Sequence, residues 1–520
     1  YFMSKLRNQA QSLPLLLSLI VPPLGLILLW KRYNGAFFKK LISSLGLILI
    51  SILYLHLFFG LHIEVDGSGI RPVFTFYRSE SHYEEIEQSR SQQRGTRVSL
   101  EADITSTVKK TDRLTIDSPI QTVETLSTDL SGSYWTNFRG PNRDGSYRER
   151  PILTDWPTNG LTLLWRHPIG GGYASFVVAE GRAFTIEQRR QREVVTSYDM
   201  ETGYEIWSHS WDADFRESMG GAGPRATPTW DEGRLYALGA TGELYCLEAF
   251  DGSVVWSRNI LTDNGAANLD WGMAVSPLVV GEKLIVLPGG LLGRSIVAYD
   301  KLSGEIIWTS LNDKQAYTSP MLVTLAGHEQ ILVVSAKRAM GLAVENGSLL
   351  WDFAWTTSFD INASQPIIAD KHHFFISSGY DHGAALIEVR KKGPGFQARA
   401  VWQNNRMKNK FNSPVLHQGY VYGLDDGILA CLDVRTGERQ WKGGRYGYGQ
   451  LLLASSHLVI LTEKGDLVLV KATPERHEEA ARFSAIQGKT WNNPVLSGGR
   501  LLVRNTTEMA SFDIRPVSTP

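Results

Sequence analysis

The sequence lacks an excess of charge of either sign, and it lacks the residue spacings of the common metal and nucleophile motifs. It has 53 lysines and arginines against 53 aspartates and glutamates in 520 residues, so no polyanionic partner such as nucleic acid is indicated. No His-x-His or Cys-x-x-Cys spacing occurs, and the adjacent His372 and His373 would point to opposite faces of a strand. No Gly-x-Ser-x-Gly or phosphate-loop pattern occurs. The sequence therefore predicts no metal site and no catalytic residues.

What the sequence does contain is a short pattern that recurs and ends in tryptophan. Four residues before each of five tryptophans stands a glycine, preceded by a small polar residue. An acid stands eight residues before the tryptophan in four of the five copies, and a small residue always stands ten before it. The pairs are Gly203 with Trp207, Gly252 with Trp256, Gly304 with Trp308, Gly347 with Trp351, and Gly437 with Trp441.

Each copy has the chemistry of a β-hairpin. The glycine suits a turn position with positive φ, and the polar residues before it can bond to the turn backbone. Apolar residues alternate on both sides of the turn, and a second pair of strands precedes each hairpin, so each unit is a four-stranded antiparallel sheet. Intervals of 49, 52 and 43 residues from Trp207 to Trp351 are typical of propeller blades. We expect the small residue ten before each tryptophan to leave room for a tryptophan of a neighbouring sheet.

Two further copies are irregular. Trp402 ends a longer one, in which residues 391–395 replace the tight turn, and Phe483 ends one that has lost its tryptophan. Three more strands are predicted near 491–496, 499–505 and 508–514, with no closing strand after them.

The missing strand is found at the other end of the repeat region. The segment around Trp165 resembles a closing strand but has no hairpin before it. We infer that this first strand completes the last blade, which would close the ring and leave no exposed sheet edge. The sequence therefore predicts an all-β, eight-bladed propeller.

The pattern Asp-x-x-Thr-Gly-x-x-x-Trp, as in Asp433–Trp441, resembles the tryptophan-docking repeat of quinoprotein dehydrogenases. It equally resembles the repeat of their non-enzymatic relatives, which include the BamB-type scaffold of the outer-membrane β-barrel assembly machinery. The segment Trp135–Gly145 is similar to the start of a bacterial group described as PQQ-binding-like propeller repeat proteins. The resemblance covers about residues 135–514 and implies the propeller fold.

For the enzymes, the resemblance implies a pyrroloquinoline quinone (PQQ) in the ring's funnel. It also implies a Ca²⁺ held by Glu and Asn, a general-base Asp and, in many, a disulfide between adjacent cysteines. This sequence has no adjacent cysteines, and no Glu, Asn and Asp set matches the enzymes' motifs. We therefore expect no cofactor. PQQ and Ca²⁺ belong to the alternative function, a membrane-bound quinoprotein dehydrogenase.

The two cysteines occupy the same repeat position. Cys246 and Cys431 stand ten residues before Trp256 and Trp441, on the second and sixth blades. They should lie far apart across the ring, whereas a disulfide needs Cα atoms within about 7 Å. Both are predicted to be free and buried.

The chain before the repeats divides into an apolar and a polar part. Residues 13–30 and 41–61 are uncharged and apolar, and the second run is long enough to span a bilayer as a helix. The first run crosses or folds back at Pro22 and Pro23. Four cations between residues 31 and 40 place that loop in the cytoplasm by the positive-inside rule. We expect a membrane anchor over 1–61, a polar extracytoplasmic linker over 62–134, the propeller over 135–514 and a tail over 515–520. A segment around 83–94 could form a surface helix, as part of a solvated spacer or as a docking segment.

The candidate binding residues lie where the chain leads into the innermost strand of each blade. These segments hold equivalent repeat positions, so they should converge on one mouth of the central channel. Their aromatic, amide and cationic groups suit a binding funnel. The alternative is that these positions are polar only because the channel mouth is exposed to solvent. The candidates are Arg225, Asp270, Trp271, Tyr317, Asn362, Lys410, Asn412, Trp491 and Asn492.

Together these features favour a non-catalytic binding or scaffolding module. We expect it in the bacterial inner membrane, with the propeller on the periplasmic side and its face loops contacting an envelope protein. Assembly of outer-membrane or envelope complexes is the function that the resemblance implies. The scaffold of that machinery is typically lipid-anchored through an N-terminal cysteine, and no such cysteine occurs in the first 61 residues.

Overall fold

The computed structural model describes residues 37–76, 80–94, 132 and 134–516 of the 520. The described chain forms two compact units. The first contains helix α3 (Phe37–Phe59) and the antiparallel pair β1 (Leu61–Val65) and β2 (Pro72–Phe76). The second contains residues 66–69, which connect β1 to β2, and the described chain from Tyr83 onward.

Helix α3 covers most of the second predicted apolar run. Its sequence is rich in leucine and isoleucine, and no charged residue follows Lys40 within it. No helix among the described residues is long and apolar enough to cross a membrane. The predicted span over 41–61 is thus confirmed as a helix but not as a membrane span, and the predicted segment 13–30 lies outside the described residues.

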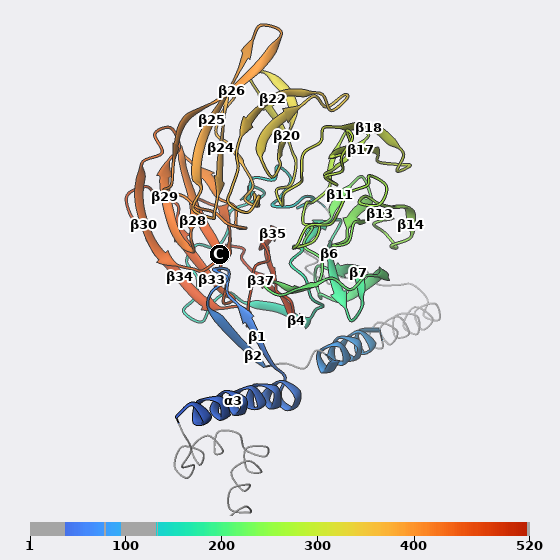
Figure 1. The fold of residues 1–520 in the computed structure, drawn as a ribbon, viewed down its shortest axis with the longest axis vertical. Coiled ribbons are helices and arrows are strands. Elements are labelled where there is room, and N and C mark those ends of the chain that lie inside the picture. Colours follow the sequence, from blue (N-terminus) through green and yellow to red (C-terminus); the bar gives the residue numbers. More distant parts are fainter. Residues whose placement is uncertain (1–36, 77–79, 95–131, 133, 517–520) are drawn as a thin grey trace, which may run out of the picture. The chain divides into compact units, whose positions relative to one another are not determined.

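The second unit contains eight blades arranged in a ring (Figure 1), numbered here in chain order. Blades 1 to 4 consist of β5 (Val177–Ala179), β6 (Arg182–Arg189), β7 (Arg192–Asp199) and β8 (Glu205–Asp212); β11 (Thr229–Asp231), β12 (Arg234–Leu238), β13 (Glu243–Glu248) and β14 (Val254–Asn259); β15 (Leu278–Val280), β16 (Lys283–Val286), β17 (Ile296–Asp300) and β18 (Ile306–Ser310); and β19 (Met321–Leu325), β20 (His328–Val334), β21 (Arg338–Leu342) and β22 (Leu349–Ala354).

The remaining blades follow the same antiparallel order, and blade 7 gains the short parallel strand β3 (Ser146–Tyr147) at its inner edge. Blades 5 to 8 consist of β23 (Ile367–Ile368), β24 (His373–Ser378), β25 (Gly383–Lys392) and β26 (Gly395–Asn404); β27 (Val415–His417), β28 (Tyr420–Asp425), β29 (Ile428–Asp433) and β30 (Arg439–Arg445); β31 (Gln450–Ala454), β32 (His457–Leu461), β33 (Asp466–Lys471) and β34 (Glu479–Ser484); and β35 (Val495–Ser497), β36 (Arg500–Arg504), β37 (Glu508–Asp513) and β4 (Leu163–Pro168). A separate small pair joins β9 (Arg216–Glu217) and β10 (Gly221–Ala222).

The ring closes as predicted. Strand β4 pairs antiparallel with β37, so that Trp165 lies opposite Ser511. A strand from the start of the repeat region therefore completes the blade formed by its end, and the prediction of eight blades is confirmed.

The repeated glycine allows neighbouring blades to dock. Gly252 has a φ of 76°, as predicted for the turn, and a Cβ at this position would lie 2.4 Å from the Trp207 ring of blade 1. The indole nitrogen of Trp207 also donates a hydrogen bond to the carbonyl of Ala249 in blade 2, at 3.0 Å. Glycine is therefore required both by the turn and by the ring stacked upon it.

The same contact recurs around the ring. The other tryptophans whose ring lies over a glycine turn of the next blade are Trp165 on Gly203, Trp256 on Gly304, Trp308 on Gly347 and Trp402 on Gly437. At the last junction Phe483 of blade 7 lies over Gly160, which precedes β4 in blade 8. Trp441 lies between blades 6 and 7 and donates to the carbonyl of Thr473 at 2.9 Å.

The small residue ten before each tryptophan was expected to make room for a tryptophan of a neighbouring sheet, and this expectation was wrong. Cys246 lies directly opposite Trp256 of the same sheet, and Cys431 lies opposite Trp441. The side chain is small because it shares one sheet face with its own cross-strand tryptophan. Both cysteines are buried and free, as predicted.

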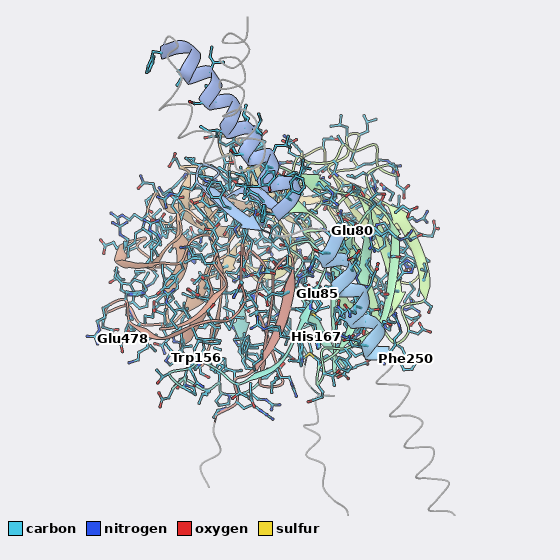
Figure 2. All side chains as sticks on the ribbon, turned by 90° about the horizontal axis from the view of Figure 1, so that it is seen from below. Glu80, Glu85, Trp156, His167, Phe250 and Glu478 are labelled. Carbon is cyan, nitrogen blue, oxygen red and sulfur yellow. The ribbon has the colours of Figure 1, made fainter. Side chains whose placement is uncertain are left out.

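The segment before the repeats contains a helix over residues 80–94, and its part from Tyr83 onward belongs to the propeller unit. Arg90 is 3% exposed and donates to the Pro168 carbonyl and the Tyr198 hydroxyl, both at 3.1 Å. Its Nε lies 3.3 Å from a carboxylate oxygen of Glu205. Figure 2 shows Glu85 of this helix beside the blade strands. Residues 83–94 therefore pack on the propeller through Arg90.

Candidate binding site at the channel mouth

The channel is crossed by residues 135–145, which we call the crossing segment. Arg139 donates to the Pro414 carbonyl at 2.7 Å and the Leu451 carbonyl at 3.3 Å, in blades 6 and 7. Arg143 donates to the carbonyls of Ser276 and Pro320, at 3.1 and 3.0 Å, on the opposite side. Backbone carbonyls at equivalent repeat positions thus hold the two arginines.

Burial changes the titration of both arginines. It lowers the pKa of Arg139 to about 10, with Asp144 opposing the change, and lowers the pKa of Arg143 to about 9. Since both values lie above neutral pH, the guanidinium groups stay charged, and backbone carbonyls accept hydrogen bonds from their Nη groups. The crossing segment is therefore a fixed floor with positive charge beneath it.

Above this floor lies a cavity of about 170 Å³, which we call the mouth pocket. Its wall is rich in aromatic rings contributed by several blades, and Phe138 of the crossing segment contributes to its lining. The lining residues are Phe138, Tyr173, Glu217, Met219, Gly220, Arg225, Trp271, Ala274, Tyr317, Ile361, Ala363, Tyr380, Phe411, Gln450, Trp491 and Asn493.

Four of the candidate residues from the sequence come together in this pocket: Arg225, Trp271, Tyr317 and Trp491. The rings of Trp271 and Tyr317 meet edge to face with centroids 5.8 Å apart. Lys410 lies close by, with its Nζ 5.4 Å from the ring centre of Tyr380, which lines the pocket. The convergence expected from the repeat positions is seen for these five residues.

The three candidate asparagines have a different place. Asn362, Asn412 and Asn492 are almost fully buried, and none lines the pocket. The Asn362 amide donates to the Ser335 carbonyl at 2.9 Å, and the Asn492 amide donates to the Ala174 carbonyl at 2.9 Å. The amides of Asn362 and Asn492 thus join backbone segments to one another, whereas the Asn412 oxygen accepts from the Asn409 side chain at 2.8 Å. Asp270 is exposed and lies outside the pocket lining.

Sequence reasoning did not select several of the lining residues. Tyr173 follows Gly170–Gly172 in the lead-in to blade 1. Phe411 stands between the candidates Lys410 and Asn412, and its ring lies 4.7 Å from that of Trp491. Tyr380 lies in the connection between β24 and β25, a position for which the repeat gave no signal. The lead-in position alone would have identified Tyr173 and Phe411.

One ion pair fixes the polar side of the pocket. Arg225 Nη2 donates to a carboxylate oxygen of Glu217 at 2.8 Å, and its guanidinium carbon lies 4.8 Å from the ring centre of Phe215. Glu217 also accepts hydrogen bonds from the backbone N–H groups of Met219 and Gly220, both at 2.6 Å. Burial lowers the pKa of Arg225, and Glu217 opposes that change.

These contacts test whether the lining suits a PQQ and Ca²⁺ site. Ca²⁺ takes six to eight oxygen ligands, usually several from carboxylates. Glu217 is the carboxylate in the lining, and its oxygens are already engaged by Arg225 and by two N–H groups. Within the described part of the chain, no group of three His, Cys, Asp or Glu could hold a metal ion. The residues of the mouth pocket do not fit the calcium set of the enzymes.

The fold is an eight-bladed propeller, and the comparisons support the resemblance to PQQ-like, BamB-type propellers that was drawn from the sequence. A family model described as outer membrane protein assembly factor BamB matches residues 191–443. BamB of Yersinia pestis is 20% identical over 291 residues, which cover 50% of this chain and 67% of that protein. BamB of Shewanella oneidensis is 21% identical over 270 residues, which cover 49% of this chain and 65% of that protein.

Solved structures show the same fold at low sequence identity. BamB from Moraxella catarrhalis matches with a TM-score of 0.51 and 14% identity, over 69% of this chain and 99% of that one. A quinohemoprotein alcohol dehydrogenase from Pseudomonas putida HK5 matches with a TM-score of 0.54 and 13% identity, over 78% of this chain and 85% of that one. Scaffold and enzyme therefore share this architecture, and the fold does not distinguish between them.

Proposed function

We propose that this chain is a non-catalytic binding module that takes part in the assembly of envelope proteins. The observation that carries the proposal is the mouth pocket, which is rich in aromatic rings and whose one carboxylate is already paired. Such a lining suits binding of a polypeptide, because aromatic side chains supply much of the energy of protein interfaces. The relatives described as outer membrane protein assembly factors support the same reading.

Exposed apolar side chains in connections that contact the segments lining the pocket add to this surface. Leu292, at the tip of the connection between β16 and β17, is 93% exposed, and its neighbour Leu291 is 68% exposed. The same connection contacts the pocket wall, because Gln315 donates to the Pro288 carbonyl at 3.0 Å two residues before Tyr317. Phe359 is 69% exposed and packs against the pocket residue Tyr380, with ring centres 5.9 Å apart. Exposed apolar groups around a pocket are typical of a protein-binding surface.

The proposal includes a place in the cell. The four cations between residues 31 and 40, followed by the uncharged run 41–61, favour attachment to the bacterial inner membrane with the propeller on the periplasmic side. Protease accessibility of the propeller in intact spheroplasts tests this. Degradation only after membrane lysis would contradict it.

The central test is site-specific photocrosslinking in intact cells. A photoreactive residue at Leu292 should capture an envelope protein, whereas one at Phe250 should not. Both side chains are exposed, at 93% and 76%, but Phe250 belongs to the hairpin between β13 and β14 (Figure 2). Trp271→Ala together with Arg225→Gln should reduce the Leu292 crosslink. Equal capture from both positions, or no effect of the pocket variants, would count against the proposal.

The enzyme alternative is tested separately with the purified full-length chain. Added PQQ and Ca²⁺ should give no saturable thermal shift and no dye-linked alcohol oxidation, because the pocket offers no free carboxylate set. Saturable binding with turnover would make the chain a quinoprotein dehydrogenase.

A further inference from the structure

Residues 66–69 form a tight turn that belongs to the propeller unit. The Gly69 N–H donates to the Asp66 carbonyl at 2.8 Å, and the Ser68 N–H donates to the Asp66 carboxylate at 3.0 Å. Gly69 has a φ of 75°, which favours glycine. Asp66 therefore closes an Asx turn with the sequence Asp-Gly-Ser-Gly.

Two charged side chains hold the backbone of this turn. The Gly67 N–H donates to Glu463 Oε1 at 2.7 Å, and Lys410 Nζ donates to the Gly67 carbonyl at 3.2 Å. We call Lys410 and Glu463 the turn clamp. The clamp binds both the backbone N–H and the backbone carbonyl of one residue, so it recognises the backbone. Which side chain that residue can have is determined by the space around it.

The sterics select glycine. Gly67 is buried, and a Cβ at this position would lie 2.3 Å from the ring of Tyr448. Lys410 Nζ lies 4.8 Å from the centre of the same ring, so Tyr448 forms the wall against which the turn rests. Any side chain at the clamped position would displace either the turn or the ring.

The turn clamp is continuous with the mouth pocket. Glu463 Oε1 also accepts a hydrogen bond from the indole nitrogen of Trp491 at 2.9 Å, and Trp491 lines the pocket. The ring of Phe411 lies between those of Trp491 and Tyr448, with centroids 4.7 and 5.7 Å away. A polypeptide held by the clamp would therefore extend its neighbouring residues along the aromatic wall.

We propose that the channel mouth recognises a glycine-centred turn of a partner protein, and that the chain's own Asp66–Gly69 turn is a tethered competitor for that position. The inference rests on the proposed function and names its ligand chemistry. A tethered segment competes at an effective concentration that is commonly in the millimolar range. The turn of a free partner therefore binds weakly until the Asp66–Gly69 turn leaves the clamp.

The test uses the full-length chain, purified in mild detergent, and a fluorescein-labelled peptide with the sequence of residues 61–76. Gly67→Val in the chain removes its own turn from the clamp, because the added side chain collides with Tyr448. The labelled peptide should bind this variant at least tenfold more tightly than the wild type. The matched control is Gly395→Ala, where no atom lies within 4 Å of the added Cβ, and it should bind the peptide like the wild type.

Two further variants identify the clamp. Lys410→Met or Glu463→Gln, each combined with Gly67→Val, should weaken peptide binding at least tenfold, and a peptide with valine at the Gly67 position should not bind. In the chain with its own Gly67, either clamp variant should speed hydrogen exchange of the Gly67 amide. Equal exchange in wild type and clamp variants, or no peptide binding to a folded Gly67→Val chain, would overturn the inference.

The outcomes also separate this inference from the proposed function. Capture of an envelope protein at Leu292 without peptide binding would leave the module's role standing and remove the turn as its ligand. Peptide binding that depends on the clamp, without any cellular crosslink, would support turn recognition and contradict the envelope role.

Discussion

The junction between blades 1 and 2 and the junction between blades 4 and 5 solve the same packing problem differently. Trp207 of blade 1 stacks on Gly252 of blade 2 and donates to a backbone carbonyl there. Trp351 of blade 4 is also buried, but its indole nitrogen donates to the Gln330 amide oxygen of its own blade. Blade 5 has the longer hairpin β25–β26, in which residues 391–395 replace the glycine turn.

The difference shows what the repeated residues do. In a regular junction the glycine serves the tryptophan of the preceding blade. At the junction of blades 4 and 5, where that glycine turn is missing, the tryptophan instead finds its acceptor in its own sheet, the side-chain oxygen of Gln330. Gly341 leaves room for this hydrogen bond. A Cβ there would lie 2.2 Å from the Gln330 oxygen and 2.3 Å from the Trp351 nitrogen.

The largest effect is expected when the regular junction is broken at its glycine. Gly252→Val places a branched side chain at a φ of 76° and against the Trp207 ring. We expect the free energy of unfolding to fall by about 3–5 kcal/mol, from backbone strain and overpacking together. Urea denaturation followed by tryptophan fluorescence measures this change. A loss below about 1 kcal/mol would show that the stacked ring does not depend on the glycine.

The second effect is a pH dependence of the same junction. Glu193 of blade 1 accepts hydrogen bonds from the Ala240 N–H of blade 2, at 3.0 and 3.2 Å, and its burial, reinforced by Glu243, raises its pKa to about 7. An unfolded glutamate titrates near 4.3, so the native state alone keeps the proton between these values. The contribution of Glu193 to stability is therefore full below about pH 4.3 and is lost as the pH rises to about 7, roughly 4 kcal/mol in all.

Glu193→Gln isolates this contribution because a neutral amide replaces the carboxyl group. The difference in free energy of unfolding between wild type and variant should grow in favour of the variant from pH 5 to pH 8. A difference that is independent of pH would contradict the raised pKa. The 4–5 junction, where the polar partner is the amide of Gln330, serves as the pH-independent comparison.

A smaller effect is expected where Gln330 is removed. Gln330→Leu leaves the buried nitrogen of Trp351 without its acceptor, and we expect a loss of about 1–2 kcal/mol. Trp351→Phe should cost less in this chain than it costs alone, since the unpaired donor is then gone. Strictly additive losses in the double variant would show that the two side chains do not stabilise one another.

The smallest effect is expected in the irregular hairpin itself. Gly395→Ala adds a methyl group with no neighbour within 4 Å, at a residue without positive φ. Its free energy of unfolding should change by less than about 0.5 kcal/mol. A larger loss would mean that this hairpin also docks on a neighbour and that the contrast with Gly252 is incomplete.

The sequence predicted the ring because each blade carries its own turn chemistry. The glycines, their positive φ and the closing strand around Trp165 were all accessible from local patterns. The stacking of Trp207 on the next blade was not, because it joins residues that no local pattern links. The same holds for Arg90, whose buried place beside Tyr198 depends on contacts between distant segments.

The site was predicted in position but only partly in composition. Repeat equivalence brought Trp271, Tyr317 and Trp491 to one mouth, as the structure shows. Repeat equivalence could not distinguish a side chain that lines the pocket from one that bonds to backbone carbonyls. Asn362 and Asn492 were therefore selected, although both are buried and donate to carbonyls. Burial of an amide is decided by neighbouring chain segments, and the sequence of one segment does not contain them.

The crossing segment has a consequence for the order in which the molecule can be completed. Arg139 and Arg143 find their carbonyl acceptors between 133 and 312 residues further along the chain. During synthesis both arginines are made long before those acceptors, and they remain hydrated until blades 3, 4, 6 and 7 exist. The floor of the channel must therefore form late, after blade 7 has reached Leu451. In a chain interrupted before Leu451, Arg139 would lack one of its acceptors. The complete floor can therefore form only after synthesis has passed Leu451.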